Sequence, residues 1–177
     1  MSAPASTREP APPLSAATRD LFDREIAKYP PDQKQSAVMA CLRILQHERG
    51  FINLATEEQV AHYLGMPTIA VHEVTTFYNM YNQRPVGRYK LNVCTNLPCQ
   101  LRDGARALHH LEQRLGIKMG ETTPDGQFTL KPVECLGSCG TAPMMQVGAD
   151  YYENLSPEKV DELLEKFRKQ ETYSRYC

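Results

Sequence analysis

The sequence is 177 residues long and carries 20 Lys and Arg against 21 Asp and Glu, for a net charge of -1. A chain of this length can bury the core of one domain or of two small ones, and its balanced charge gives no electrostatic reason to expect a nucleic acid or an anionic membrane surface as a partner. No stretch approaches about 18 consecutive apolar residues, so we expect a soluble chain with no direct membrane insertion, acting at most as a peripheral subunit.

The first half of the sequence predicts a helical domain over residues 14–84. Residues 1–13 are rich in proline and lack apolar periodicity, which predicts a disordered tail. Apolar residues then recur at helical spacing in four stretches, and the predicted helices cover about residues 14–29, 32–50, 56–64 and 67–81. The third helix is predicted to begin at Thr56, because Thr56 and Gln59 have the spacing of a capping box.

The pattern changes after Pro85. Alternating apolar residues predict strands, and helical spacing returns in two stretches; the strands cover about residues 89–93, 128–133 and 144–147, and the helices about residues 103–115 and 156–167. Tyr151 and Tyr152 follow a turn at Gly148. The expected order is four helices and then βαββα, with two cysteine pairs in loops that follow strands, where such folds place their sites.

Four of the 6 cysteines form two closely spaced pairs. The first pair, Cys94 and Cys99, has the spacing C-x4-C, and the second, Cys135 and Cys139, has C-x3-C. Zinc sites usually use a tighter C-x2-C spacing, since two intervening residues suffice to bring neighbouring thiolates onto one tetrahedral ion. A 2Fe-2S cluster needs two thiolates on each of two irons, and plant-type ferredoxins also use a C-x4-C step. The spacing indicates an iron–sulfur site, with each pair on one iron or with the pairs crossing between the irons.

Spacing alone leaves other uses of the cysteines open. One zinc ion is an alternative, as are disulfides or structural thiols, although disulfides need an oxidising compartment and no apolar export segment follows the proline-rich start. A thioredoxin-type dithiol would need C-x-x-C, which the sequence lacks. Cys41 lies in an apolar helical pattern and is predicted to be a small buried side chain, while Cys177, the last residue, is predicted to be mobile.

Three segments resemble a known family. They are Val-Thr-Thr-Phe-Tyr-Asn-Met-Tyr at 74–81, Gly-Arg-Tyr-Lys-Leu-Asn-Val-Cys-Thr-Asn-Leu-Pro-Cys at 87–99, and Phe-Thr-Leu-Lys-Pro-Val-Glu-Cys-Leu-Gly-Ser-Cys-Gly-Thr-Ala-Pro at 128–143. Over nearly all of residues 14–170 the chain is similar to the small 2Fe-2S subunit of the NADH dehydrogenase module of respiratory complex I, known in bacteria as the E subunit. The resemblance implies an α+β protein, with an N-terminal helical bundle over 14–84 and a C-terminal thioredoxin-like α/β domain over 85–177. It also implies one 2Fe-2S cluster, bound by Cys94, Cys99, Cys135 and Cys139.

The resemblance also implies a function and partners. It implies an electron-transfer subunit of proton-translocating NADH:quinone oxidoreductase, which handles electrons from FMN after NADH oxidation, with quinone as the final acceptor. FMN and NAD(H) are expected in a partner, the flavin- and NADH-binding subunit, and further complex I subunits are expected in the assembly, on the cytoplasmic side of the bacterial inner membrane. The chain alone is not expected to be catalytic, because it has no Gly-rich dinucleotide fingerprint and a lone one-electron cluster cannot accept a hydride. Related subunits serve NAD-reducing hydrogenases and NAD-dependent formate dehydrogenases, which the sequence separates poorly from complex I.

Four residues beside the cysteines each have two interpretations. Gly137 and Gly140 are expected either to let backbone amides approach the cluster sulfurs or simply to form turns. Glu134 is expected to keep the reduction potential low if its charge points inward, and otherwise to be solvated. Pro143 lies where thioredoxin-like folds often place a cis-proline, although the base frequency of X-Pro bonds favours trans.

A helix-turn-helix pattern gives a second class of function. Residues 56–72 resemble such a motif, and an iron–sulfur transcription regulator would combine it with the cysteine cluster. Charge argues against this interpretation, because residues 51–83 contain no Lys or Arg and phosphate contacts need cations.

The end of the helical half is rich in large apolar side chains although it contains none of the paired cysteines. Phe77, Tyr78, Met80 and Tyr81 are of the types favoured in the cores of protein interfaces, which predicts that this half docks on the flavin subunit. Packing into the helical core is the competing explanation.

Overall fold

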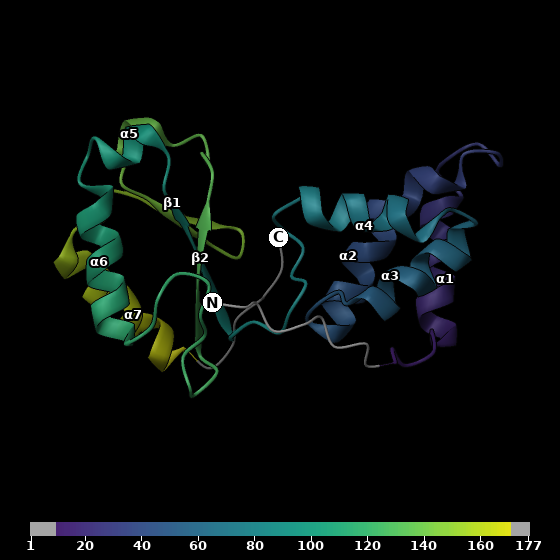
Figure 1. Ribbon diagram of the computed structural model, residues 1–177, viewed down its shortest axis with the longest axis horizontal. Coiled ribbons are helices and arrows are strands. Elements are labelled where there is room, and N and C mark those ends of the chain that lie inside the picture. Colours follow the sequence, from purple (N-terminus) through teal and green to yellow (C-terminus); the bar gives the residue numbers. More distant parts are fainter. Residues whose placement is uncertain (1–9, 171–177) are drawn as a thin grey trace. The chain divides into compact units, whose positions relative to one another are not determined.

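The computed structural model describes residues 10–170, which divide into two compact units after Pro85. These residues form seven α-helices and one four-stranded sheet, so the expected mixture of helices and sheet is confirmed. Helices α1 to α4 belong to the first unit, and the sheet belongs with α5 to α7 to the second (Figure 1). Residues 1–9 of the predicted tail, and Cys177, lie outside the described residues.

The first unit is a group of helices around one apolar core. Its elements are α1 (Ala16–Ile26), a 3-10 turn (Lys34–Ala37), α2 (Val38–Arg49), α3 (Leu54–Leu64) and α4 (Thr68–Phe77). The core is built on fully buried side chains that include Phe22, Leu42, Leu45, Ile52, Val60 and Val71. Cys41 is 0 % exposed in this core, as predicted, and burial raises the pKa of its thiol to about 12. The chain before α1 also touches this unit, because the Gln59 side chain donates to the carbonyl of Pro12 at 2.9 Å.

Several helix boundaries differ from those predicted. Helix α3 begins before Thr56, because Asn53 is its N-cap and accepts a hydrogen bond from the Thr56 amide at 2.9 Å. Asparagine is a stronger N-cap than threonine, so the capping-box interpretation was wrong. Helix α4 ends at Phe77 rather than near Tyr81, since Tyr78 already has an extended backbone. Helices α1 and α2 are likewise shorter than predicted at the segment that joins them.

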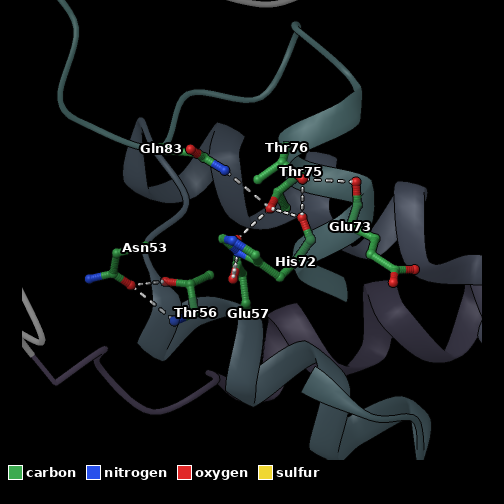
Figure 2. A network of polar contacts seen from close by, with 8 residues as sticks. All are labelled: Asn53, Thr56, Glu57, His72, Glu73, Thr75, Thr76 and Gln83. Atoms are coloured by element: carbon green, nitrogen blue, oxygen red, sulfur yellow. Dashed lines mark hydrogen bonds and ion pairs between the residues drawn. The ribbon is translucent and has the colours of Figure 1, made fainter. Parts of the chain in front are cut away.

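A buried carboxylate joins α3 to α4 (Figure 2). Glu57 on α3 is 1 % exposed, and its carboxylate accepts a hydrogen bond from the Thr75 hydroxyl of α4. The second carboxylate oxygen lies 2.9 Å from Nδ1 of His72, also on α4. Because a buried carboxylate without partners is costly, these contacts favour one way of packing α4 on α3.

Replacing Glu57 by alanine is therefore expected to lower the free energy of unfolding by about 3 kcal/mol, since Thr75 and His72 lose their acceptor and a buried space opens. Chemical denaturation followed by far-ultraviolet circular dichroism measures this change. Glu58→Ala is the matched control, because Glu58 is the next residue of the same helix and is exposed, and we expect it to change stability by less than about 0.5 kcal/mol. Equal effects of the two substitutions would contradict the structural role of the network.

The second unit is a sheet packed against two helices. Its elements are β1 (Tyr89–Cys94), α5 (Leu97–Gln100), α6 (Gly104–Leu115), β2 (Phe128–Val133), a 3-10 turn (Cys139–Thr141), β3 (Met145–Val147), β4 (Asp150–Tyr152) and α7 (Pro157–Lys169). The strand order is β2-β1-β3-β4, with β1 parallel to β2 and the other pairs antiparallel. Alternate strand residues such as Leu91 and Leu130 share one core with Leu111 of α6 and Leu164 of α7. No helix within residues 10–170 is long and apolar enough to cross a membrane.

Candidate metal centre

Both cysteine loops leave the same edge of the sheet. Strand β1 ends at Cys94 and strand β2 ends at Val133, and these two residues are partners in the parallel pairing. The Thr95 amide donates to the Val133 carbonyl at 3.1 Å, which keeps the two chain segments together just past the strand ends. The C-x4-C and C-x3-C loops therefore begin side by side, each after a strand as predicted.

The first cysteine pair is buried. Cys94 is 4 % exposed at the end of β1, and Cys99 is 1 % exposed in α5, where both belong to a small apolar cluster with Ala142 and Met144. Helix α5 is a single turn that begins within the C-x4-C loop and includes Cys99. The sequence analysis missed it because four residues are too few for apolar periodicity. Gly104, the first residue of the next helix, lies close to the backbone of Cys99. A side chain would not fit there, since a Cβ would lie 2.6 Å from the Cys99 carbonyl oxygen.

The second cysteine pair is more open to solvent. Cys135 is exposed and Cys139 is half-buried, and their sulfurs lie 3.5 Å apart. Gly137 between them has a φ of 82°, and its amide donates to the sulfur of Cys135 at 3.4 Å, so the first interpretation of this glycine is confirmed. Gly140 shows neither a positive φ nor a close neighbour at the position of a Cβ, which leaves the turn as its role.

The four thiols interact with one another. Burial raises the pKa of Cys99 to about 11, and its hydrogen bond with Cys94 acts in the same direction. A hydrogen bond with Cys135 raises the pKa of Cys139, and the charge of Cys94 raises it as well, so the two pairs are electrostatic neighbours. Metal ligation requires thiolates. The thiols of Cys99 and Cys139 therefore resist losing their protons unless a positively charged centre compensates them.

This arrangement fits a two-iron cluster. Four free thiols in two neighbouring pairs match the donor set of such a cluster. A tetrahedral zinc ion takes four ligands around one centre, whereas a 2Fe-2S cluster takes two thiolates on each iron. Backbone amides at two sulfurs, from Gly137 to Cys135 and from Met144 to Cys99, supply hydrogen bonds that stabilise negative charge.

Polar contacts brace the cysteine loops. Glu134 is exposed and accepts a hydrogen bond from the Asn96 side chain at 2.6 Å, so it is solvated and also links the two loops. Tyr151 donates to the carbonyl of Leu136 at 2.8 Å, and Glu153 accepts hydrogen bonds from Ser138 and Thr141. Sequence reasoning missed Tyr151 and Glu153, because nothing local marks a tyrosine or a glutamate as the partner of a distant loop.

Two further expectations concern Pro143 and the state of the cysteines. The Ala142–Pro143 bond is cis, so the expectation of a trans bond from base frequency was wrong. All described cysteines, including Cys41 in the other unit, carry free thiols rather than disulfides.

Comparison with known proteins points to one family. A sequence profile described as thioredoxin-like 2Fe-2S ferredoxin matches residues 22–168. The chain is 46% identical over 150 residues to the NADH-quinone oxidoreductase E subunit 2 of Rhizobium meliloti (strain 1021), an alignment that covers 85% of this chain and 88% of that protein. It is 42% identical over 149 residues to the NADH-quinone oxidoreductase E subunit of Rickettsia prowazekii (strain Madrid E), with 84% of each covered.

A solved structure shares the fold. The crystal structure of an NAD+-reducing NiFe-hydrogenase in the air-oxidized state superposes with a TM-score of 0.65 and 20% sequence identity. The superposition covers 77% of this chain and 23% of the hydrogenase chain, so this protein corresponds to less than a quarter of that longer chain. At this identity the likeness describes the fold alone.

Proposed function

Because the chain belongs to the thioredoxin-like 2Fe-2S ferredoxin family, we propose that it is the small electron-transfer subunit of an NADH:quinone oxidoreductase. Two proteins named as the E subunit of NADH-quinone oxidoreductase are 42% and 46% identical to it over most of its length. The observation that carries the proposal is the convergence of two cysteine pairs at one edge of the sheet, each at the end of a neighbouring parallel strand.

The cluster ligands in this proposal are Cys94, Cys99, Cys135 and Cys139. A bound 2Fe-2S cluster would supply one-electron transfer. The chain's own residues hold the four sulfurs, and the amides of Gly137 and Met144 donate to two of them. The half-open second loop gives the centre a solvent-facing side, whereas the apolar cluster around Cys94 and Cys99 closes the other.

The proposed partner is the flavin subunit of the same complex, which binds FMN and NADH. Hydride chemistry would take place there, and this chain would handle single electrons from FMN, with quinone as the final acceptor of the whole assembly. Further subunits would anchor the assembly, and this chain would lie peripherally on the cytoplasmic side of the bacterial inner membrane. The absence of a membrane-spanning helix in residues 10–170 is compatible with that position.

We assign separate roles to the two parts of the chain. An N-terminal helical bundle over residues 14–84 would dock on the partner, and a thioredoxin-like domain over residues 85–177 would hold the cluster. The division of the described residues into two compact units after Pro85 supports this assignment, as does the location of all four paired cysteines in the second unit.

The equivalent diaphorase subunit of an NAD-reducing hydrogenase or formate dehydrogenase is the second candidate. The shared fold with an NAD+-reducing NiFe-hydrogenase favours it, but the identity there is 20% against 46% for the relative from Rhizobium meliloti. Purifying the native complex through this chain distinguishes them, since the first candidate predicts quinone reduction by NADH and the second predicts hydrogen- or formate-dependent reduction of NAD+. A DNA-binding regulator has less support, because α3 and the helix after it fall in a stretch without Lys or Arg.

The isolated protein is expected to contain about two irons and two acid-labile sulfides per chain when it is purified without oxygen. Colorimetric iron and sulfide assays, together with the electron paramagnetic resonance spectrum of the dithionite-reduced protein, measure this content. Stoichiometric zinc without sulfide in the native protein would refute the proposed cluster.

A further inference from the structure

Strand β4 and the residues that follow it form hydrogen bonds with the second cysteine loop at several points. The Tyr151 hydroxyl donates to the carbonyl of Leu136 at 2.8 Å, between Cys135 and Gly137. One carboxylate oxygen of Glu153 accepts hydrogen bonds from the hydroxyls of Ser138 and Thr141, the latter at 2.6 Å. These two residues lie on either side of Cys139. The contacts therefore reach the loop near both of its cysteines.

Glu153 is itself fixed to the body of the second unit. The Lys159 ammonium of α7 donates to the backbone carbonyl of Glu153 at 2.5 Å. The next residue, Asn154, donates its amide to the carbonyl of Thr141 at 2.7 Å. The second cysteine loop is therefore hydrogen-bonded to a segment that is itself held in place. The loop has little structure of its own, since Cys135 is exposed and the 3-10 turn Cys139–Thr141 is its one regular element.

We propose that Tyr151 and Glu153 are positioning residues for the cluster, which hold the second cysteine loop at the spacing of its two ligands, and that the charge of Glu153 lowers the reduction potential of the centre. The inference rests on the proposed cluster at Cys94, Cys99, Cys135 and Cys139. Their hydrogen bonds go to Leu136, Ser138 and Thr141 rather than to a ligand sulfur, so each acts through the loop. Partners of this kind around a metal ligand set typically change metal affinity by roughly tenfold or more when they are removed.

The sign of the redox effect follows from charge. Reduction by one electron makes the cluster and its four thiolates one unit more negative. A carboxylate bonded to the residues that flank Cys139 opposes this added charge, and it therefore favours the oxidised form. Removing the carboxylate charge raises the equilibrium constant for reduction, and a tenfold rise corresponds to about 59 mV for a one-electron couple.

Three full-length variants separate the two roles of this segment. Glu153→Gln keeps a hydrogen-bond acceptor but removes the charge, so reduction by dithionite is expected to become roughly threefold or more favourable with little loss of iron. Glu153→Ala removes both the hydrogen-bond acceptor and the charge, and Tyr151→Phe removes only the hydrogen bond to the Leu136 carbonyl. Both of these are expected to lose iron to a chelator roughly tenfold faster than the unmodified protein, and Tyr151→Phe is expected to keep its potential.

Glu162→Gln is the matched control, because Glu162 is an exposed glutamate of α7 and its replacement changes the net charge equally. The inference would be overturned if Glu153→Gln, Glu153→Ala and Tyr151→Phe all had the midpoint potential and the rate of iron loss of the unmodified protein. If Glu153→Ala does not fold, the near-isosteric Glu153→Gln and Tyr151→Phe decide the question alone. An unmodified protein without a 2Fe-2S spectrum would refute the proposed function itself, whereas an intact cluster with unaffected variants refutes only this inference.

Discussion

Alanine in place of any one of the four proposed ligands is expected to strip or degrade the 2Fe-2S cluster; the variants are Cys94→Ala, Cys99→Ala, Cys135→Ala and Cys139→Ala. Each iron needs two thiolates, and the other described cysteine, Cys41, is buried in the other unit, so it cannot replace a lost ligand without unfolding that core. The visible absorption spectrum and the iron and sulfide content of each variant measure the loss. We expect the buried pair to matter most for folding as well, because Cys94 and Cys99 lie in an apolar cluster.

The two remaining cysteines provide the control. Cys41→Ser and Cys177→Ser are expected to leave the visible spectrum of the folded protein intact, although Cys41→Ser places a hydroxyl in an apolar core and should lower stability. Loss of the cluster in Cys177→Ser alone would overturn the ligand assignment, because it would make the last residue of the chain a ligand.

The helices and strands around the cysteine loops could be predicted because each follows from a pattern of neighbouring residues. Alternating apolar residues identified β1 and β2, and short cysteine spacing identified the loops that follow. Parallel pairing then brings the two loops to one edge, with Cys94 opposite Val133. Helix α6 and the start of α7 were equally local. An apolar stripe marks α6, and at α7 Ser156 is the N-cap and is followed by proline, a signal that is readable within a few residues.

The features that sequence reasoning missed depend on longer-range contacts or on competition between neighbours. Glu153 lies 15 positions from Ser138, and no local pattern reveals that they meet. The cis state of Pro143 is selected by its surroundings, which a base frequency ignores. At the start of α3 two residues, Asn53 and Thr56, are of types that can cap a helix. Asn53 is the N-cap, and the Thr56 amide and hydroxyl both donate to its side chain.

The apolar residues at the end of the helical unit now separate into two groups. Tyr81 is 3 % exposed and its hydroxyl donates to the Met39 carbonyl at 3.0 Å, so core packing is the correct explanation for this residue. Phe77 is 80% exposed and Met80 50% exposed. Tyr78, between them, and Ile69, near the start of α4, are also exposed. Large apolar side chains that the unit does not bury are typical of an interface with another protein.

A fragment spanning residues 85 to 177 is therefore expected to keep a 2Fe-2S spectrum but to bind the flavin subunit much more weakly than the whole chain. The fragment retains all four proposed ligands and the core of the second unit, whereas it lacks Phe77 and Met80. We expect the fragment to keep some affinity for the flavin subunit, because Leu97 and Leu101, near the first cysteine pair, are exposed apolar residues. Affinity for the purified flavin subunit, measured by biolayer interferometry, compares the fragment with the whole chain.

A single substitution in the whole chain tests the same idea without removing a unit. Phe77→Ser is expected to weaken binding to the flavin subunit by roughly tenfold, because aromatic residues carry much of the energy of interface cores, and to leave stability nearly unchanged because Phe77 is so exposed. Leu21→Ser is the matched control, since Leu21 is an exposed apolar residue on α1 of the same unit. If the fragment binds at full strength, the interface is formed by the unit that holds the cluster. If Phe77→Ser and Leu21→Ser bind alike, the helical unit does not dock through Phe77.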